Sequence, residues 1–279
     1  MTAEHDAIKE GSTVSKDGTR ISYKYLGEGP GLLIVHGGFR ASQHYMALAK
    51  NLADAFTVYV MDRRGRNASG PKGNDYSFRK ELEDIDAILK QNHIGLLFGH
   101  SFGAFASLHA AMEYPLSKLA VYEPPVPSYL PIDWLPQFEK EMQKGDYVAG
   151  SATFLKGLKM GGWIGKLPKP VLKMLFSMMA RGADDWEENV QLIGTVPEEV
   201  RAVLNWNFKM ERLSNIHSPT LILYGTKTTD YLIQSAKDMA RYIPNHQLIA
   251  LDGLAHNAPD DQAPEQIARQ LKTFFIEGS

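Results

Sequence analysis

Short apolar runs alternate along this chain with segments whose apolar residues recur at helical spacing, and this alternation restricts the fold more than any other feature. The apolar runs are residues 31–35, 56–62, 94–99, 118–123, 220–225 and 246–253. Helical spacing covers residues 42–54, 77–92, 103–114, 231–242 and 262–276. Short, continuously apolar strands are typical of a parallel sheet buried on both faces. We therefore predict an α/β fold with a mostly parallel sheet and flanking helices, preceded by a hairpin at residues 12–26.

The alternation stops between residues 124 and 212. This stretch begins with Pro124-Pro125 and continues as helical segments without a convincing strand. It holds all four tryptophans and six of the eleven methionines. We predict a core formed by residues 1–125 and 212–279 and an inserted helical cap at residues 126–211.

Composition excludes several classes of protein. The 279 residues include no cysteine, so a thiol nucleophile, a disulfide framework and a thiolate metal site are excluded. The net charge of −2 gives no overall attraction to nucleic acid or to an anionic membrane. No run approaches the roughly 18 apolar residues of a membrane span, and the N-terminus does not read as a secretory signal. We expect a cytoplasmic monomer or homodimer without nucleic-acid or membrane partners.

The pentapeptide Gly99-His100-Ser101-Phe102-Gly103 matches G-x-S-x-G and lies after a predicted strand and before a predicted helix. In that context the serine occupies a cramped strand-to-helix turn, where flanking side chains would collide. The amides at the start of the following helix favour a developing negative charge. Ser101 is therefore the candidate nucleophile.

A second glycine-rich turn, His36-Gly37-Gly38-Phe39, follows an earlier strand. A loop at this place can supply an oxyanion hole, in which the backbone N–H of Gly38 would act together with that of Phe102. The alternative is a simple strand-to-loop turn.

His256 lies between the last predicted strand and the last predicted helix. A histidine in this loop, after the serine in chain order, is the candidate general base. A histidine packed in the core is the alternative. His36 and His100 neighbour the two glycine motifs, and their positions suit packing and loop bracing.

These motifs resemble the α/β-hydrolase fold family over essentially the whole chain outside the variable cap. Asp62-Arg63-Arg64-Gly65-Arg66 is similar to the D-x-R-G-x-G-x-S loop of that family, although Arg66 and Asn67 stand where small residues are commoner. The resemblance implies an eight-stranded, mostly parallel sheet with an inserted cap. It also implies a serine hydrolase that works through a catalytic triad.

The acid of the triad has two candidates. The usual family position, a few residues after strand 220–225, is occupied by Thr228, and Asp230 lies two residues later. Zearalenone lactonases and some haloalkane dehalogenases are similar in placing the acid after the preceding sheet strand, where this chain has Glu123. An unpaired carboxylate at a buried strand end is costly, so we favour Glu123 and keep Asp230 as the alternative. The alternative role of Glu123 is structural, as one partner of a salt bridge that braces the cap.

The expected reaction is acyl transfer from a small apolar ester or lactone, because the nucleophile is a serine and the cap is rich in aromatic and methionine side chains. The residues predicted to line the substrate pocket are Phe39, Trp134, Trp163, Trp186 and Trp206. Metal-ligand spacings are missing and no G-x-G-x-x-G follows a strand, so we expect no metal and no cofactor. The alternatives are a cofactor-free lyase or peroxidase with the same triad, a ligand receptor that hydrolyses slowly, and a non-catalytic scaffold.

Overall fold

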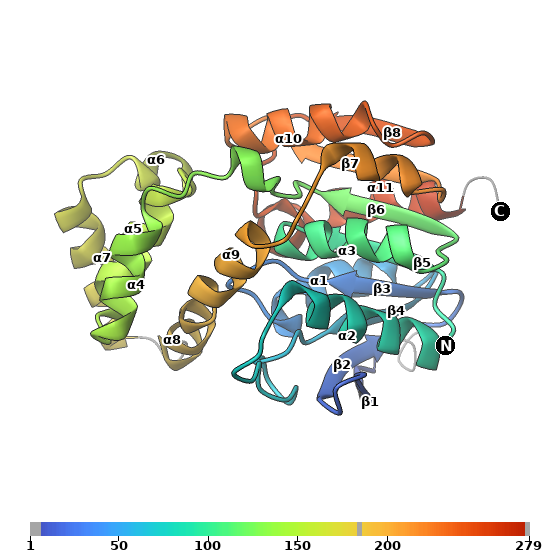
Figure 1. The fold of residues 1–279 in the computed structure, drawn as a ribbon, viewed down its shortest axis with the longest axis horizontal. Helices are drawn as coiled ribbons and strands as arrows, with labels where there is room; N and C mark the ends of the chain where they lie inside the picture. The colour runs from blue at the N-terminus through green and yellow to red at the C-terminus, as the bar shows by residue number, and fades with distance from the viewer. Residues whose placement is uncertain (1–6, 183–185, 277–279) are drawn as a thin grey trace.

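Eight strands form one sheet in the computed structural model, which describes residues 7–182 and 186–276 (Figure 1). The strands are β1 (Lys9–Val14), β2 (Arg20–Leu26), β3 (Gly31–Val35), β4 (Thr57–Met61), β5 (Leu96–His100), β6 (Lys118–Tyr122), β7 (Thr220–Gly225) and β8 (His246–Leu251). Their order is β1-β2-β4-β3-β5-β6-β7-β8. β2 runs antiparallel to β1 and β4, and the other five strand pairs are parallel, so the predicted hairpin and the mostly parallel sheet are confirmed.

Helices cover both faces of the sheet. One face packs against α2 (Phe78–Gln91), α3 (Phe102–Glu113) and α10 (Asp230–Ala240), and the other against α1 (Met46–Leu52) and α11 (Pro264–Ile276). Side chains along β3 alternate between the two faces of the sheet. Leu33 packs in the core on the first face and Leu32 in the core on the second.

The helix predicted at residues 42–54 differs from the structure at its start. A 3₁₀ turn, η1 (Ser42–Tyr45), precedes α1. Ser42 donates its backbone N–H to Asp62 Oδ1 at 2.9 Å. This contact joins η1 to the loop after β4, and helical spacing in the sequence cannot reveal such a contact.

Between β6 and β7 the described residues form helices joined by turns and loops, without a strand, and we call residues 126–211 the cap segment. Its helices are α4 (Leu135–Gln143), α5 (Tyr147–Gly157), α6 (Gly162–Gly165), α7 (Lys169–Gly182), α8 (Trp186–Gly194) and α9 (Val196–Leu204), with 3₁₀ turns η2 (Pro127–Tyr129) and η3 (Met210–Asn215). Figure 1 shows α4 to α7 at one end of the molecule, with α8 and α9 between them and the sheet. Trp134, Phe138 and Ile193 form a separate apolar core in this segment, and Phe39 of the sheet domain packs against it.

Across the described ranges, we find no helix with the length and apolar character that crossing a membrane requires.

Candidate active site

Ser101 lies on the turn between β5 and α3 in a backbone conformation that residues other than glycine rarely adopt, with φ 54° and ψ −121°. Its N–H donates to Tyr122 O of the neighbouring strand at 2.9 Å. A side chain at Gly99 would lie 2.5 Å from Gly103 O, and one at Gly103 would lie 2.2 Å from Val35 O. The two glycines of G-x-S-x-G are therefore required by close backbone approach.

The glycine turn after β3 lies against this serine. A Cβ atom at Gly37 would lie 3.2 Å from Ser101 Cβ. Phe102 is the first residue of α3, so its N–H has no acceptor within the helix. The two segments predicted to form the oxyanion hole are thus neighbours in space, and the roles of Gly38 and Phe102 stay a prediction.

Arg63 and His36 brace this turn from behind. His36 Nδ1 bonds Gly37 O at 2.8 Å, and its Nε2 accepts the Arg63 N–H at 3.1 Å. Burial, reinforced by the charges of Arg63 and Arg66, holds the pKa of His36 well below its usual value, so this ring is neutral. The Arg63 guanidinium lies 3.8 Å from the centroid of the Phe102 ring. His36 therefore has the bracing role predicted from its position.

His256 forms a hydrogen bond with the buried Glu123 carboxylate. His256 Nδ1 lies 2.6 Å from Glu123 Oε2, and the Glu123 side chain is fully buried. The other Glu123 oxygen accepts the Gly225 N–H at 2.8 Å, and Thr228 Oγ1 donates to Oε2 at 2.8 Å. Glu123 also has a positive φ, 49°, which marks it as a second strained residue. The carboxylate is therefore fixed in position by three donors.

Asp230, the alternative acid, is the first residue of α10 and is exposed. The structure records no contact between Asp230 and His256 within the described chain. Thr228, at the family's usual acid position, instead donates to Glu123. The loop that carries His256 is held by Tyr122, whose hydroxyl donates to Ala255 O at 2.8 Å.

The ring of His100, beside Ser101, packs against that of His256 with centroids 4.8 Å apart. His100 Nδ1 lies 2.5 Å from the Tyr45 hydroxyl, which accepts the Gly37 N–H at 3.2 Å. Burial, together with the neighbouring His256 ring, holds the pKa of His100 well below its usual value. A neutral His100 therefore connects the Ser101 turn, the His256 ring and the glycine turn after β3.

A buried ionic cluster joins the cap segment to this site. Glu199 of α9 lies 2.6 Å from Arg66, 3.0 Å from Arg63 and 3.3 Å from Lys72, and its side chain is 2% exposed. Burial alone would raise the pKa of Glu199, but the three positive charges outweigh it and hold the pKa well below its usual value. Arg66, a departure from the family pattern, therefore binds the cap segment to the core. No local pattern in the sequence indicates this pairing, because the partner is 133 residues away.

The predicted pocket residues lie in different surroundings. The ring of Phe39 packs on Phe154 of α5 at 5.9 Å, and Trp134 packs on Phe154 at 5.6 Å. Trp186 begins α8 and is half-buried. Trp163 lies on α6 with 73% of its surface exposed.

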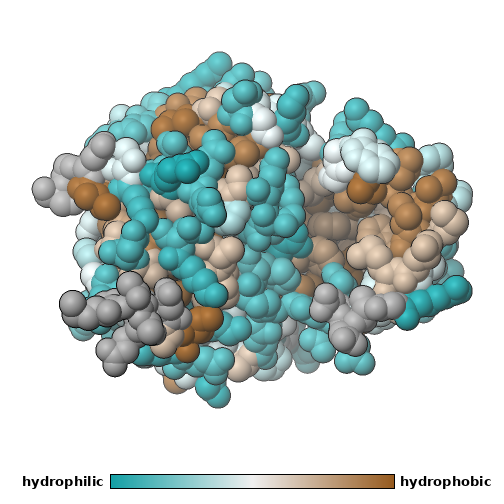
Figure 2. All heavy atoms as spheres, turned by 180° about the vertical axis from the view of Figure 1, so that it is seen from behind, coloured by the Kyte–Doolittle hydropathy of each residue, from teal (hydrophilic) through white to brown (hydrophobic). Residues whose placement is uncertain are grey.

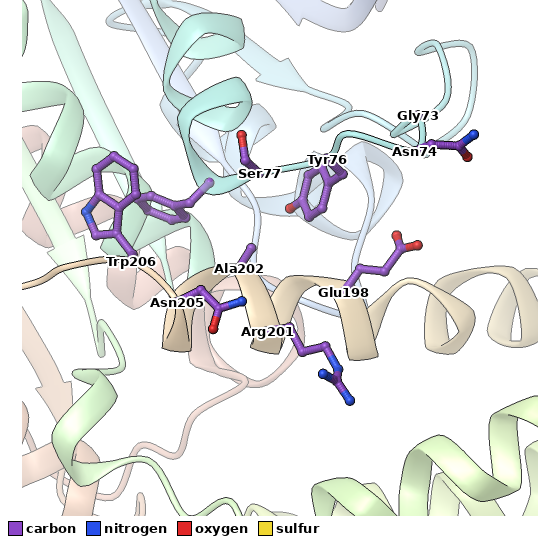
Figure 3. A pocket seen from close by; sticks show the side chains of 10 residues that line it. Gly73, Asn74, Tyr76, Ser77, Glu198, Arg201, Ala202, Asn205 and Trp206 are labelled. Atoms are coloured by element: carbon purple, nitrogen blue, oxygen red, sulfur yellow. The ribbon is translucent and has the colours of Figure 1, made fainter.

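Trp206 packs against Phe78 and His109, with ring centroids 5.0 and 5.6 Å apart. It also lines a cavity of about 450 Å³ between α9 and the stretch leading into α2 (Figure 3). In Figure 3, the stretch that carries Tyr76 and Ser77 runs alongside α9, and the Ser77 hydroxyl points away from that helix. The structure thus places the glycine turn against Ser101, and His256 against Glu123 and His100. Among the described residues it records no contact of Trp163 or Trp206 with any of them. The lining of the substrate pocket stays a prediction.

A serine on a strained strand-to-helix turn and a histidine–carboxylate pair, both carried by a mostly parallel sheet with a helical insertion, define the α/β hydrolases. The chain belongs to the alpha/beta hydrolase family, whose family model matches residues 32–270.

Relatives within this family have several activities. The chain is 36% identical over 163 residues to N-formylmaleamate deformylase of Pseudomonas putida, covering 52% of this chain and 60% of that protein. It is 32% identical over 123 residues to 2-(acetamidomethylene)succinate hydrolase of Mesorhizobium japonicum, covering 43% of this chain and 41% of that protein. These matches therefore span less than two thirds of the curated relatives. The structure of an alpha/beta hydrolase from Sphaerobacter thermophilus matches with a TM-score of 0.78 and 30% identity, covering 95% of this chain and 100% of that one.

Proposed function

We propose that this protein is a serine hydrolase that uses Ser101, His256 and Glu123 as its catalytic triad. The observation that carries the proposal is the 2.6 Å contact between His256 Nδ1 and the buried Glu123 carboxylate. A carboxylate at Nδ1 leaves Nε2 free to accept the serine proton and stabilises the imidazolium that forms. The strained turn that carries Ser101 supports its role as nucleophile.

The reaction proceeds in two steps. Ser101 Oγ attacks the substrate carbonyl while His256 takes the hydroxyl proton, and the carbonyl oxygen becomes an oxyanion held by the Gly38 and Phe102 N–H groups. His256 then returns the proton to the leaving group, which gives an acyl-enzyme. Water, deprotonated by the same histidine, releases the acid and restores the serine.

The proposed substrates are small apolar esters or lactones, as expected from the aromatic residues of the cap segment. Trp134, Phe154 and Phe39 form one apolar cluster that joins the cap segment to the glycine turn after β3. The names of two relatives specify N-formyl and acetamido compounds. An assay panel should therefore pair each ester with its amide.

Covalent labelling tests the proposal directly. A fluorophosphonate probe should modify one serine in the folded protein, and Ser101→Ala should abolish labelling and hydrolysis of the ester panel. Ser107→Ala is the matched control, because Ser107 is a buried serine on α3 whose hydroxyl has no partner among the described residues. Persistent labelling of Ser101→Ala, or loss of labelling in the control alone, would refute the proposed nucleophile.

A further inference from the structure

Arg40 joins the glycine turn after β3 to the segment that carries His256. Its Nε donates to Asp260 Oδ2 at 2.5 Å, and its Nη1 donates to Phe39 O at 3.0 Å. The Asp260 side chain is only 2% exposed and that of Arg40 is 29% exposed, so water screens this ion pair weakly. One guanidinium therefore contacts both the turn predicted to hold the oxyanion and the segment that follows the proposed general base. Hydrophilic and hydrophobic side chains mix over the outer face of the molecule in Figure 2, and this contact lies beneath that surface.

Asp260 lies on a short π-helix, η4 (Ala258–Gln262), which begins two residues after His256. Turns of this kind are rare and are frequent at functional sites. Gln262, the last residue of η4, accepts the Ala255 N–H at 2.8 Å through its side-chain oxygen. This contact closes η4 back onto the residue before His256. Asp260 and His256 are therefore parts of one internally bonded segment.

The other contact of Arg40 falls on a strained peptide. Phe39 has φ 57°, a left-handed conformation that bulky residues rarely adopt and that persists only where surrounding contacts hold it. The Arg40 side chain supplies one such contact at Phe39 O, and Arg66 Nε supplies another to the next carbonyl, Arg40 O, at 3.1 Å. Gly38 directly precedes Phe39, so a relaxation of this peptide would shift the Gly38 N–H.

We propose that Arg40 and Asp260 are a positioning pair that holds the glycine turn after β3 in place relative to His256, an inference that rests on the proposed catalytic triad. Oxyanion donors and the general base act on one tetrahedral centre, so their separation has to be fixed. Arg40 and Asp260 connect the two segments that carry these groups. A pair that only stabilised the fold could be replaced by apolar side chains without loss of rate.

The test replaces both members at once, as Arg40→Met with Asp260→Leu. Removing one member would leave the other buried and unpaired, whereas replacing a whole buried ion pair by apolar groups is often neutral or stabilising. We therefore expect an unfolding midpoint near that of the unchanged protein. We expect kcat for a small ester and the rate of fluorophosphonate labelling to fall about a hundredfold, with KM within about threefold, because a displacement of about 1 Å in a catalytic site costs on that order.

A second variant, Arg40→Lys, keeps the positive charge beside Asp260. It loses the planar fork that reaches Asp260 and Phe39 O together, so we expect kcat to fall about tenfold. This variant tests the proposal even if the double variant does not fold.

Hydrogen exchange measures the turn independently of catalysis. The amides of residues 37–40 should exchange roughly tenfold faster in the double variant, because the strained turn loses a contact that holds it. The matched control, Lys169→Met with Glu141→Leu, removes a 2.9 Å ion pair in the cap segment whose side chains are 35% and 9% exposed. It should leave kcat, the labelling rate and the exchange of residues 37–40 as in the unchanged protein.

Two results would overturn the proposal. One is full kcat and full labelling rate in the folded variants at Arg40, which would make the ion pair a purely structural contact. The other is unaltered exchange of residues 37–40. Absence of labelling in the unchanged protein would instead refute the proposed nucleophile, and the exchange of the turn would still show whether Arg40 and Asp260 hold it.

Discussion

Replacing Glu123 by Gln removes one negative charge from a fully buried site and changes the side-chain shape very little. The carboxylate accepts three hydrogen bonds, from His256 and Thr228 at Oε2 and from Gly225 at Oε1. A glutamine has one acceptor oxygen and one NH₂ group, so it cannot satisfy all three donors.

Both orientations of the new amide have a defined cost. If the amide oxygen faces His256, the NH₂ group faces the Gly225 N–H, and a buried donor loses its acceptor at about 1–3 kcal/mol of stability. If the NH₂ group faces His256, it requires the proton on Nε2, and the ring can no longer accept the serine proton. In the serine-protease template that change lowers turnover about ten-thousand-fold. We expect at least a hundredfold loss of turnover, because either orientation also removes the charge that stabilises the imidazolium.

The assay is the rate of fluorophosphonate labelling together with turnover of a small ester, and urea unfolding measures the stability cost separately. Asp230→Asn is the matched control, since it removes one negative charge from an exposed residue at the start of α10. It should lower turnover less than tenfold. A loss of turnover of a hundredfold or more in Asp230→Asn would show that Asp230 is the acid. A small loss of turnover in both variants would show that neither carboxylate stabilises the imidazolium.

Two further predictions concern buried charge. Glu199→Gln should destabilise the protein by roughly 3–5 kcal/mol, because it leaves Arg63 and Arg66 buried with less compensating charge. The control Glu198→Gln changes a side chain that is 58% exposed and should cost less than about 0.5 kcal/mol. Equal losses of unfolding free energy in urea for the two variants would contradict the prediction. Burial lowers the pKa of His109 to about 4, against about 6.5 in an unfolded chain. The unfolded chain therefore binds a proton that the folded protein excludes as pH falls from about 6.5 to 4, and roughly 2–3 kcal/mol of stability should be lost by pH 4.5. His109→Phe should remove that loss, and an unchanged difference in unfolding free energy between pH 7 and 4.5 would refute the assignment.

The order of elements along the chain and the place of the Ser101 turn could be predicted from the sequence because both depend on local patterns. Continuous apolar runs identified the buried parallel strands, and G-x-S-x-G located the serine turn. At Gly99 and Gly103 a Cβ atom would lie less than 3 Å from neighbouring atoms, so the motif records a steric requirement of one turn. His256 was found for the same reason, by its place between the last strand and the last helix.

The partners of buried charges depend on contacts between residues far apart in the chain. Glu123 lies 133 residues from His256, and the sequence left it in competition with Asp230. The fold alone shows that the end of β6 meets the loop after β8, and that Thr228 completes the hydrogen bonds of Glu123. Arg66 departs from the family pattern because it forms an ion pair with Glu199 of the cap segment. The sequence by itself thus determined the succession of strands and helices along the chain and the place of the Ser101 turn, which follow from local backbone geometry. Only the tertiary structure decided which carboxylate meets His256 and which side of the cap is exposed, because burial and charge pairing are properties of the packed chain.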